Sequence, residues 1–122
     1  MTFLLLTDII ILTPQVNFSE GRDDLKIEYK NKSIEKVCTD ASVAEKKYGL
    51  DMAYKIAQRM EEIKASDTVE QMIQYRLGRC HPLQGNRKNQ FAVDLVHPKR
   101  LVFEKKGSTI QIANIIEVVD YH

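Results

Sequence analysis

The sequence predicts an α+β domain in which a twisted antiparallel sheet carries an N-terminal helical hairpin on one face. Apolar residues recur at helical spacing between residues 34 and 73, whereas apolar and polar residues alternate from residue 91 onward. A stretch with two Gly and one Pro, residues 78–88, interrupts both patterns and is expected to be a loop. The 122 residues fit one domain, and 43% hydrophobic residues are enough for a core.

Residues 1–24 differ from the rest of the chain. They hold two apolar runs, residues 3–6 and 9–12, which are too short for a membrane-spanning helix of about 20 residues. The basic start and the small-residue cleavage site of a signal peptide are also missing. We expect residues 1–24 to be an appendage and residues 25–122 to form the compact domain. The alternative is that the first segment adds a strand or short helix to the sheet.

The first half of the domain is expected to contain one strand and three helices. Residues 25–30 alternate apolar with charged side chains, as in a half-buried strand. Residues 34–48 form one helical stripe, which Gly49 is suited to end. A second helix follows at once, so the two should form an antiparallel hairpin. Asp67 and Glu70 have the spacing of a capping box and start a short third helix.

The second half is expected to be a set of strands. Residues 91–97 and 100–104 alternate in character on either side of a turn at Pro98. A second turn near Gly107 leads to a final strand over residues 109–120. Strands joined by such short turns pair antiparallel. The final strand is rich in Ile and Val, which favours a place inside the sheet over a place at its edge.

The formal net charge of +1 conceals an uneven distribution. Residues 76–106 contain eight Lys or Arg against Asp94 and Glu104, a local excess of six positive charges. Such an excess favours a polyanionic partner over a neutral ligand. The alternative is an ordinary solvated charged face.

Two segments carry side chains suited to phosphate chemistry. The loop offers groups that hold or attack a phosphate: Arg79, His81, Arg87 and Lys88. The chain ends in a carboxylate, a phenol and an imidazole: Asp120, Tyr121 and His122. RNA cleavage without a metal needs a base for the 2′-hydroxyl, cations for the phosphate and an acid for the leaving oxygen. These residue types supply all three.

The cysteines predict neither a disulfide framework nor a metal site. Cys38 and Cys80 are too few for such a framework and show no CxxC spacing, so we expect both to be reduced in a cytoplasmic protein. A metal site from Cys80, His81, His97 and His122 is conceivable, but no pair has zinc-finger spacing. We therefore predict no metal and no cofactor.

Four segments in order resemble a known family. They read GRCHPLQGNRK at residues 78–88, FAVDL at residues 91–95, HPKRLVFE at residues 97–104 and EVVDYH at residues 117–122. Together they resemble HigB-type toxins of the RelE/ParE superfamily. The resemblance covers residues 25–122 and implies a RelE-like fold, while residues 1–24 have no counterpart in the family domain.

The resemblance implies a ribosome-dependent endoribonuclease that cleaves messenger RNA, leaves a 2′,3′-cyclic phosphate and inhibits translation. The catalytic residues that it implies are His81, Arg100, Asp120, Tyr121 and His122. The other cations near these segments are expected to bind RNA: Arg79, Arg87, Lys88, Lys99, Lys105 and Lys106. Some relatives have Lys where this chain has Gln84, a cation that Arg87 or Lys88 can replace. The implied partners are a HigA-like helix-turn-helix antitoxin, the ribosome and messenger RNA, with no membrane.

The residues leave the order of proton transfer open. Asp120 or His122 can be the base and His81 or His122 the acid, with Arg100 and Arg87 on the phosphate. Two other functions also remain open. One is a ParE-like toxin that inhibits DNA gyrase without cleaving RNA, which has no need of two imidazoles. The other is a non-catalytic nucleic-acid-binding module, which would need a larger aromatic stacking platform.

Overall fold

The computed structural model describes residues 24–120, so the predicted appendage lies outside the described residues except for Asp24. The predicted α+β class is confirmed. The elements in chain order are β2 (Lys26–Tyr29), α1 (Lys32–Thr39), α2 (Ala41–Tyr48), α3 (Leu50–Ala65), α4 (Val69–Gln74), the 3-10 helix η3 (Leu77–Arg79), β3 (His81–Pro82), β4 (Gln90–Asp94), β5 (Lys99–Lys106) and β6 (Ile112–Asp120). Of the helices within this range, none has the length and apolar character needed to cross a membrane.

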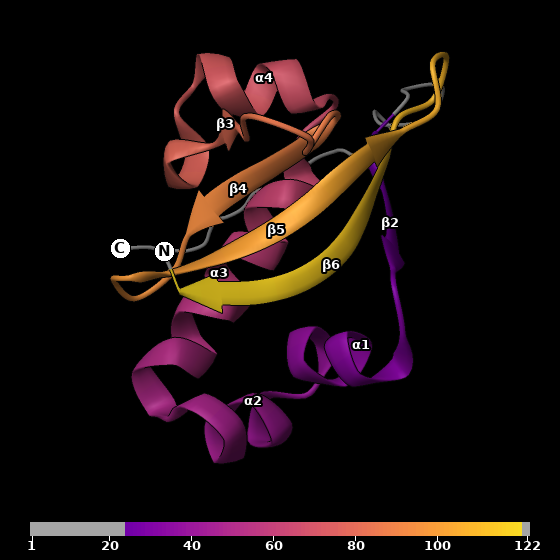
Figure 1. The fold of residues 1–122 in the computed structure, drawn as a ribbon. Coiled ribbons are helices and arrows are strands. Elements are labelled where there is room, and N and C mark those ends of the chain that lie inside the picture. The colour runs from indigo at the N-terminus through magenta and orange to yellow at the C-terminus, as the bar shows by residue number, and fades with distance from the viewer. Residues whose placement is uncertain (1–23, 121–122) are drawn as a thin grey trace, which may run out of the picture.

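The sheet has five strands in the order β2-β6-β5-β4-β3 (Figure 1). The three pairs from β3 to β6 are antiparallel. The pairs β4–β5 and β5–β6 were predicted, whereas β3 lies in the segment that was predicted to be a loop. β2 adds a parallel pair with β6, with Lys26 opposite Ile112, so the prediction of an antiparallel sheet is wrong at this strand. Helices α1 to α4 and strands β3 to β5 lie between β2 and β6 in sequence, which gives the long connection that a parallel pair needs. β6 therefore lies between β2 and β5, which confirms the prediction of an interior final strand.

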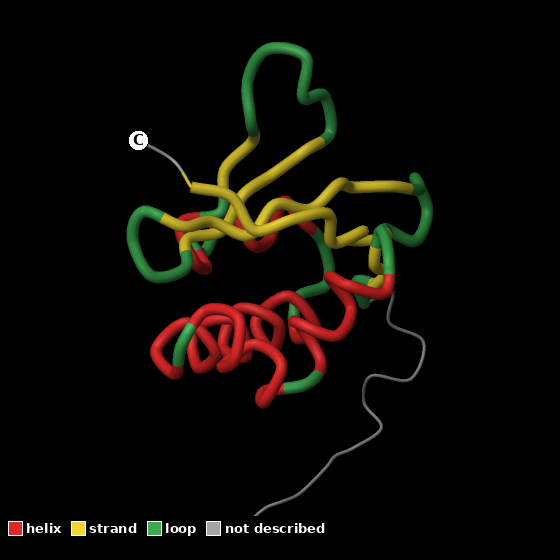
Figure 2. The backbone as a smooth tube through the Cα atoms, turned by 60° about the horizontal axis from the view of Figure 1, so that its bottom comes forward, coloured by secondary structure: helices red, strands yellow, loops and turns green. Residues whose placement is uncertain are grey.

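The core lies between the sheet and the helices, which gather on one side of it (Figure 2). The predicted stripe of α3 is confirmed, since Ile56, Met60 and Ile63 are almost fully buried. They belong to the same cluster as Leu101 and Phe103 of β5. Burying one such side chain contributes about 1.5–3 kcal/mol relative to leaving it exposed. Burial on this face thus determines which side of β5 points away from the helices.

The single helix predicted over residues 34–48 is wrong, because Asp40 divides it into α1 and α2. Asp40 is extended, with φ −127° and ψ 106°, and its N–H bonds Lys36 O to end α1. Its carboxylate accepts from the backbone N–H groups of Ser42 and Val43 and caps α2. An Asp side chain competes in this way with helix continuation. Hydrogen bonds, first that of the Ser42 hydroxyl, lower the pKa of Asp40.

The predicted start of α4 is displaced by one residue. Thr68, not Asp67, is the N-cap, and its hydroxyl oxygen accepts from Gln71 N–H at 3.0 Å. Gln71 Oε1 in turn accepts from Asp67 N–H at 2.8 Å. The capping pair is thus Thr68 and Gln71 instead of Asp67 and Glu70. Glu70 is therefore available for a different contact.

Glu70 connects α4 to β5 and to the residue before β6. Its carboxylate accepts from Lys105 Nζ at 2.7 Å and from Gln111 Nε2 at 2.9 Å. These hydrogen bonds, that of Lys105 first, lower the pKa of Glu70 from 4.5 to about 2. An acid whose pKa is lower in the folded state adds stability above its ordinary pKa, and that stability is lost as the pH falls through about 2.

We expect Glu70→Gln to lower the free energy of unfolding by about 0.2–1 kcal/mol at pH 7, the usual range for an exposed ion pair. The loss should shrink at pH 2, where about half of the native Glu70 carboxylate is itself protonated. Urea unfolding at both pH values measures it. Glu61→Gln is the control, because Glu61 makes a long contact of 3.8 Å with Lys64 and its side chain is 78% exposed. Equal losses for Glu70→Gln at both pH values would contradict the assignment.

Candidate functional site

His81 lies on the face of the sheet that points away from the helices. The loop predicted over residues 78–88 contains the two-residue strand β3, in which His81 pairs with Ala92. Ala92 pairs in turn with Val102. The neighbouring positions Val93 and Leu101 face the helices, and side chains alternate along a strand. A short edge strand, rather than a free loop, therefore positions the imidazole.

The hydrogen bonds of His81 define its tautomer. Nδ1 lies 2.8 Å from the carbonyl oxygen of Arg79, which can only accept, so we assign the proton to Nδ1. The neutral ring then presents a lone pair at Nε2. Arg100 Nη1, which can only donate, lies 3.4 Å from Nε2. The structure thus brings together two predicted catalytic residues, with a proton-accepting nitrogen directed at a guanidinium.

Asp94 holds two guanidinium groups beside His81. It pairs with Arg100 across β4 and β5, and its Oδ1 lies 3.3 Å from Arg100 Nε. Its Oδ2 lies 3.4 Å from Arg79 Nε. The side chains of Asp94 and Arg100 are each 24% exposed, whereas that of Arg79 is 77% exposed. Arg100 is therefore held in place, while Arg79 remains open to a ligand.

Sequence reasoning did not single out Asp94, although it carried a signal. A carboxylate inside a strand with buried neighbours needs a charged partner. Folding the strands about the predicted turn at Pro98 places Arg100 opposite Asp94. Asp94 could therefore have been identified by asking which charged residues lie opposite each other in the predicted hairpin.

The backbone before His81 is strained. Arg76, Gly78 and Arg79 have φ values of 57°, 58° and 54°. A left-handed conformation costs a non-glycine residue roughly 1–2 kcal/mol. The carbonyl that accepts from His81 belongs to Arg79, one of these residues. Such strain persists where surrounding contacts over-determine the conformation, and it concentrates at functional sites.

The predicted meeting of the loop with the chain terminus stays a prediction, because Tyr121 and His122 lie outside the described residues. Asp120 is the last described residue and pairs with Lys99, whose Nζ donates to its Oδ1. Val119 is opposite Arg100. Strand alternation therefore assigns Asp120 to the other face of the sheet from Arg100.

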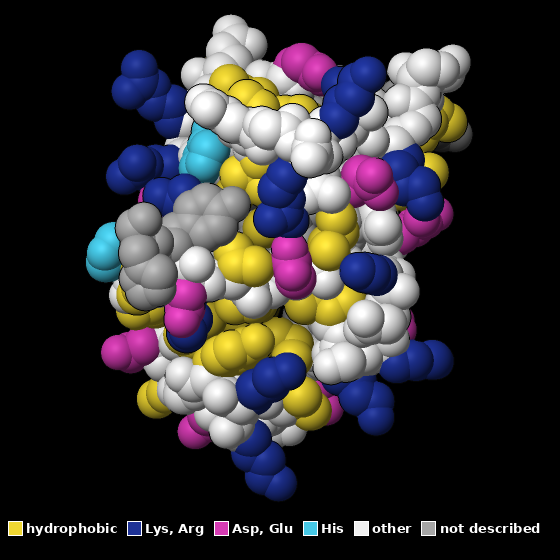
Figure 3. All heavy atoms as spheres, in the orientation of Figure 1, with side chains coloured by type: hydrophobic (Ala, Val, Ile, Leu, Met, Phe, Trp, Pro, Cys, Tyr) yellow, Lys and Arg dark blue, Asp and Glu magenta, His cyan; other side chains and the backbone are white. Residues whose placement is uncertain are grey.

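Several of the cations predicted to bind RNA are ion-paired, so the face is less positive than the sequence suggested. Arg87 Nη2 lies 2.7 Å from Glu117 Oε2, and Arg87 Nε donates to Gln90. Lys105 and Lys106 pair with Glu70 and Glu28 at the far end of β5, about 20 Å along the strand from Arg100. Lys88 is exposed. Figure 3 shows acidic side chains interspersed among the basic ones.

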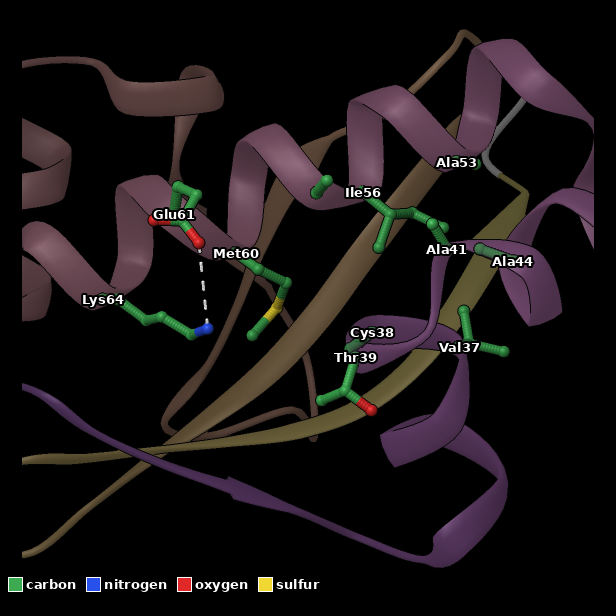
Figure 4. A pocket seen from close by; sticks show the side chains of 11 residues that line it. Val37, Cys38, Thr39, Ala41, Ala44, Ala53, Ile56, Met60, Glu61 and Lys64 are labelled. Carbon is green, nitrogen blue, oxygen red and sulfur yellow. Dashed lines mark ion pairs between the residues drawn. The ribbon is translucent and has the colours of Figure 1, made fainter.

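A cavity of about 240 Å³ lies among the helices (Figure 4). Its lining residues come from α1, α2 and α3 and are mainly apolar, with the Glu61–Lys64 ion pair at one end. The His81 cluster lies on the opposite face of the sheet. The His81 cluster thus belongs to an open surface and not to this cavity. An open surface suits a large ligand better than a small molecule that must be enclosed.

The cysteines are unsuited to chemistry at neutral pH. Burial raises the pKa of the Cys38 and Cys80 thiols to about 12. Both therefore stay protonated, and the thiol is a poor nucleophile and metal ligand. Between residues 24 and 120, no group of three or more His, Cys, Asp or Glu side chains is arranged to hold a metal ion.

The raised thiol pKa predicts slow alkylation of the native protein. A shift from 9.0 to about 12 lowers the thiolate fraction at pH 7.5 by about 10³-fold. We expect iodoacetamide to modify both cysteines at least about 10²-fold more slowly in the native chain than in urea. Cys38→Ser and Cys80→Ser separate the two rates by mass spectrometry. A native thiol that reacts as fast as the unfolded one would overturn its assignment.

Comparisons with known proteins agree with this fold. No protein-family model matches the chain, and no curated protein sequence matches it. Among solved structures, it is similar to a YoeB/ParE toxin from Agrobacterium tumefaciens, with 17% identity and a TM-score of 0.55 over 80% of this chain and 100% of that chain. Identity this low is evidence about the fold alone. The chain therefore has the fold of the RelE/ParE toxin superfamily, as the sequence resemblance implied.

Proposed function

We propose that this chain is the toxin of a type II toxin–antitoxin system, a HigB-type endoribonuclease that cleaves messenger RNA on the ribosome without a metal. The observation that carries the proposal is the pair of His81 and Arg100. An imidazole with a lone pair at Nε2 lies 3.4 Å from a guanidinium on the face of the sheet away from the helices. The similarity to a YoeB/ParE toxin supports the toxin fold, and the side chains support the nuclease chemistry.

The proposed reaction begins with Arg100 and Arg79 on the scissile phosphate. A guanidinium fork binds two phosphate oxygens at once and steadies the charge that develops on them. His81 Nε2 accepts the proton of the 2′-hydroxyl, and the 2′-oxygen attacks phosphorus. The bond to the 5′-oxygen breaks, which leaves a 2′,3′-cyclic phosphate. The tautomer of His81 favours it as the base, a role that the sequence had left to Asp120 or His122. Because Asp120 is assigned to the other face of the sheet, the acid that protonates the 5′-oxygen is left to His122.

The ion pairs define how RNA would enter this site. Arg79 is exposed enough to exchange Asp94 for a phosphate, while Arg100 keeps its partly buried contact. Arg87 and Lys88 are on the neighbouring loop and would contact the RNA backbone. Lys99 pairs with Asp120, which is assigned to the other face of the sheet, and would contact RNA only at the strand end. Lys105 and Lys106 would contact a more distant part of the message or the ribosome.

The alternative function is a ParE-like toxin that inhibits DNA gyrase without cutting RNA. The pairing of Arg87 with Glu117 and of Lys99 with Asp120 favours it, because these contacts reduce the charge available to a polyanion. Either toxin would be cytoplasmic and neutralised by an antitoxin, which we propose to be a HigA-like helix-turn-helix protein. The cluster of His81, Arg100 and Asp94 favours the nuclease, since a protein-binding surface does not need an oriented imidazole.

His81 provides the main test. We expect His81→Gln and His81→Ala to lower the rate of translation-coupled messenger cleavage by about 10²–10⁴-fold, the usual contribution of a general base. His97→Gln is the matched control, because His97 is exposed in the turn between β4 and β5 and should keep the wild-type rate. Primer extension on ribosome-bound message measures cleavage. Growth arrest with intact message and inhibited supercoiling would replace the nuclease proposal with the gyrase alternative.

Arg100→Lys tests whether fork geometry matters beyond charge. Lysine keeps the cation but loses the planar donors, so we expect single-turnover cleavage to fall by about 10²–10³-fold. Lys64→Arg makes the reverse change in the last turn of α3, on the helix side of the sheet, and it should leave the rate unaltered. A wild-type rate for Arg100→Lys would remove Arg100 from the phosphate.

A further inference from the structure

A mostly buried arginine lies on the helix side of the sheet, behind the His81 cluster. Arg59 of α3 has a side chain only 12% exposed, which is uncommon for arginine unless it is paired. Its Nη1 donates to both carboxylate oxygens of Glu62, at 3.0 and 3.2 Å. Its Nε donates to the backbone carbonyl of Asp94 at 2.6 Å. Arg59 thus links α3 to the last residue of β4.

The same side chain packs against η3. A Cβ added to Gly78 would lie 2.7 Å from Arg59 Nε and 2.8 Å from Arg59 Cδ, closer than real Cβ contacts. Gly78 also has a φ of 58°, which glycine adopts without strain. The backbone of η3 therefore lies directly on the arginine, three residues before His81.

These two contacts join the segments from which the cluster is built. On one segment, the Arg79 carbonyl orients the imidazole of His81. On the other, the Asp94 carboxylate holds Arg100 and Arg79. The charge of Arg59 is paired with that of Glu62, so a geometric effect on the cluster is the one to consider.

We propose that Arg59 is a positioning residue, which sets the distance between η3 and the end of β4 and thereby keeps His81 in its Nδ1–H tautomer facing Arg100. The consequence for RNA cleavage rests on the proposed function. The consequence for the imidazole does not, so the two can fail separately. A misplacement of about 1 Å is enough to lower a rate by about 10²-fold.

The test uses two variants of the full chain that disturb the contact from opposite sides. Arg59→Lys keeps the charge but cannot bond Asp94 and Glu62 in the same geometry, and Gly78→Ala keeps Arg59 but forces it away. Lys55→Arg is the control on the same helix, because the Lys55 side chain donates a hydrogen bond to Gln58 of the same helix. Long-range ¹H–¹⁵N spectra at pH 8 report the tautomer, with His81 assigned through His81→Gln.

We expect wild type and Lys55→Arg to show a protonated Nδ1 and an unprotonated Nε2. Arg59→Lys and Gly78→Ala should lose this preference and, if the nuclease proposal holds, lower kcat of message cleavage by about 10²-fold with little change in KM. A wild-type tautomer in both folded variants would overturn the positioning role even if both are less stable. Altered tautomers in a protein that never cleaves RNA would support the positioning role and sink the nuclease.

Discussion

The register of the β4–β5 hairpin is the constraint on which the candidate site depends. It places Asp94 opposite Arg100 and Phe91 opposite Phe103. The two phenylalanine rings stack with centroids 5.8 Å apart, and such pairs contribute about 0.5–1.5 kcal/mol beyond their buried area. A slip of one residue would move every side chain to the opposite face. Packing against the helices therefore determines which charges meet on the other side of the sheet.

The ion pairs explain how the basic segment of residues 76–106 gives a surface of mixed charge. Arg87 and Lys99 each contact a carboxylate of β6, which lies far away in sequence. An exposed ion pair of this kind contributes little to stability, about 0–1 kcal/mol, so a phosphate can displace the carboxylate at small cost. Binding of this type depends on many simultaneous contacts and falls steeply with salt. Under the proposed function, free RNA would bind weakly, and the ribosome would have to present the message.

The parts of the fold predicted from sequence are those that packing dictates. The stripe of α3 reflects burial in the core, which a periodic pattern reports directly. Leu101 and Phe103 of β5 belong to the same core, as their shared face predicted, although Val102 between them is buried as well. The break at Asp40 escaped prediction because a local side-chain cap overrode a periodic stripe. The parallel partner of β2 escaped it because nothing near residues 26–29 indicates a strand more than 80 residues later.

The candidate site was also predicted from the sequence only in part. His81 and Arg100 were identified by residue type and by resemblance, and they do lie together. Asp94 could be identified only from the register of the β4–β5 hairpin, which places it opposite Arg100. Arg59 had no signal at all, since its partners are a backbone carbonyl 35 residues away and the surface of a glycine. A backbone acceptor is present at nearly every residue, so no sequence pattern marks the one that is used.

The strained turn before His81 connects the helix layer with the candidate site. Glycine would be the least costly residue at each left-handed position, yet Arg79 is not glycine, and its side chain reaches Asp94. One residue therefore contributes a carbonyl to the imidazole and a guanidinium to the carboxylate, and both depend on the same backbone conformation. Position 78 is glycine, in contrast, because any side chain there would collide with Arg59. Under the proposed role of Arg59, the helix layer would act on the open face through this turn, because Arg59 lies against Gly78 and donates to the carbonyl oxygen of Asp94.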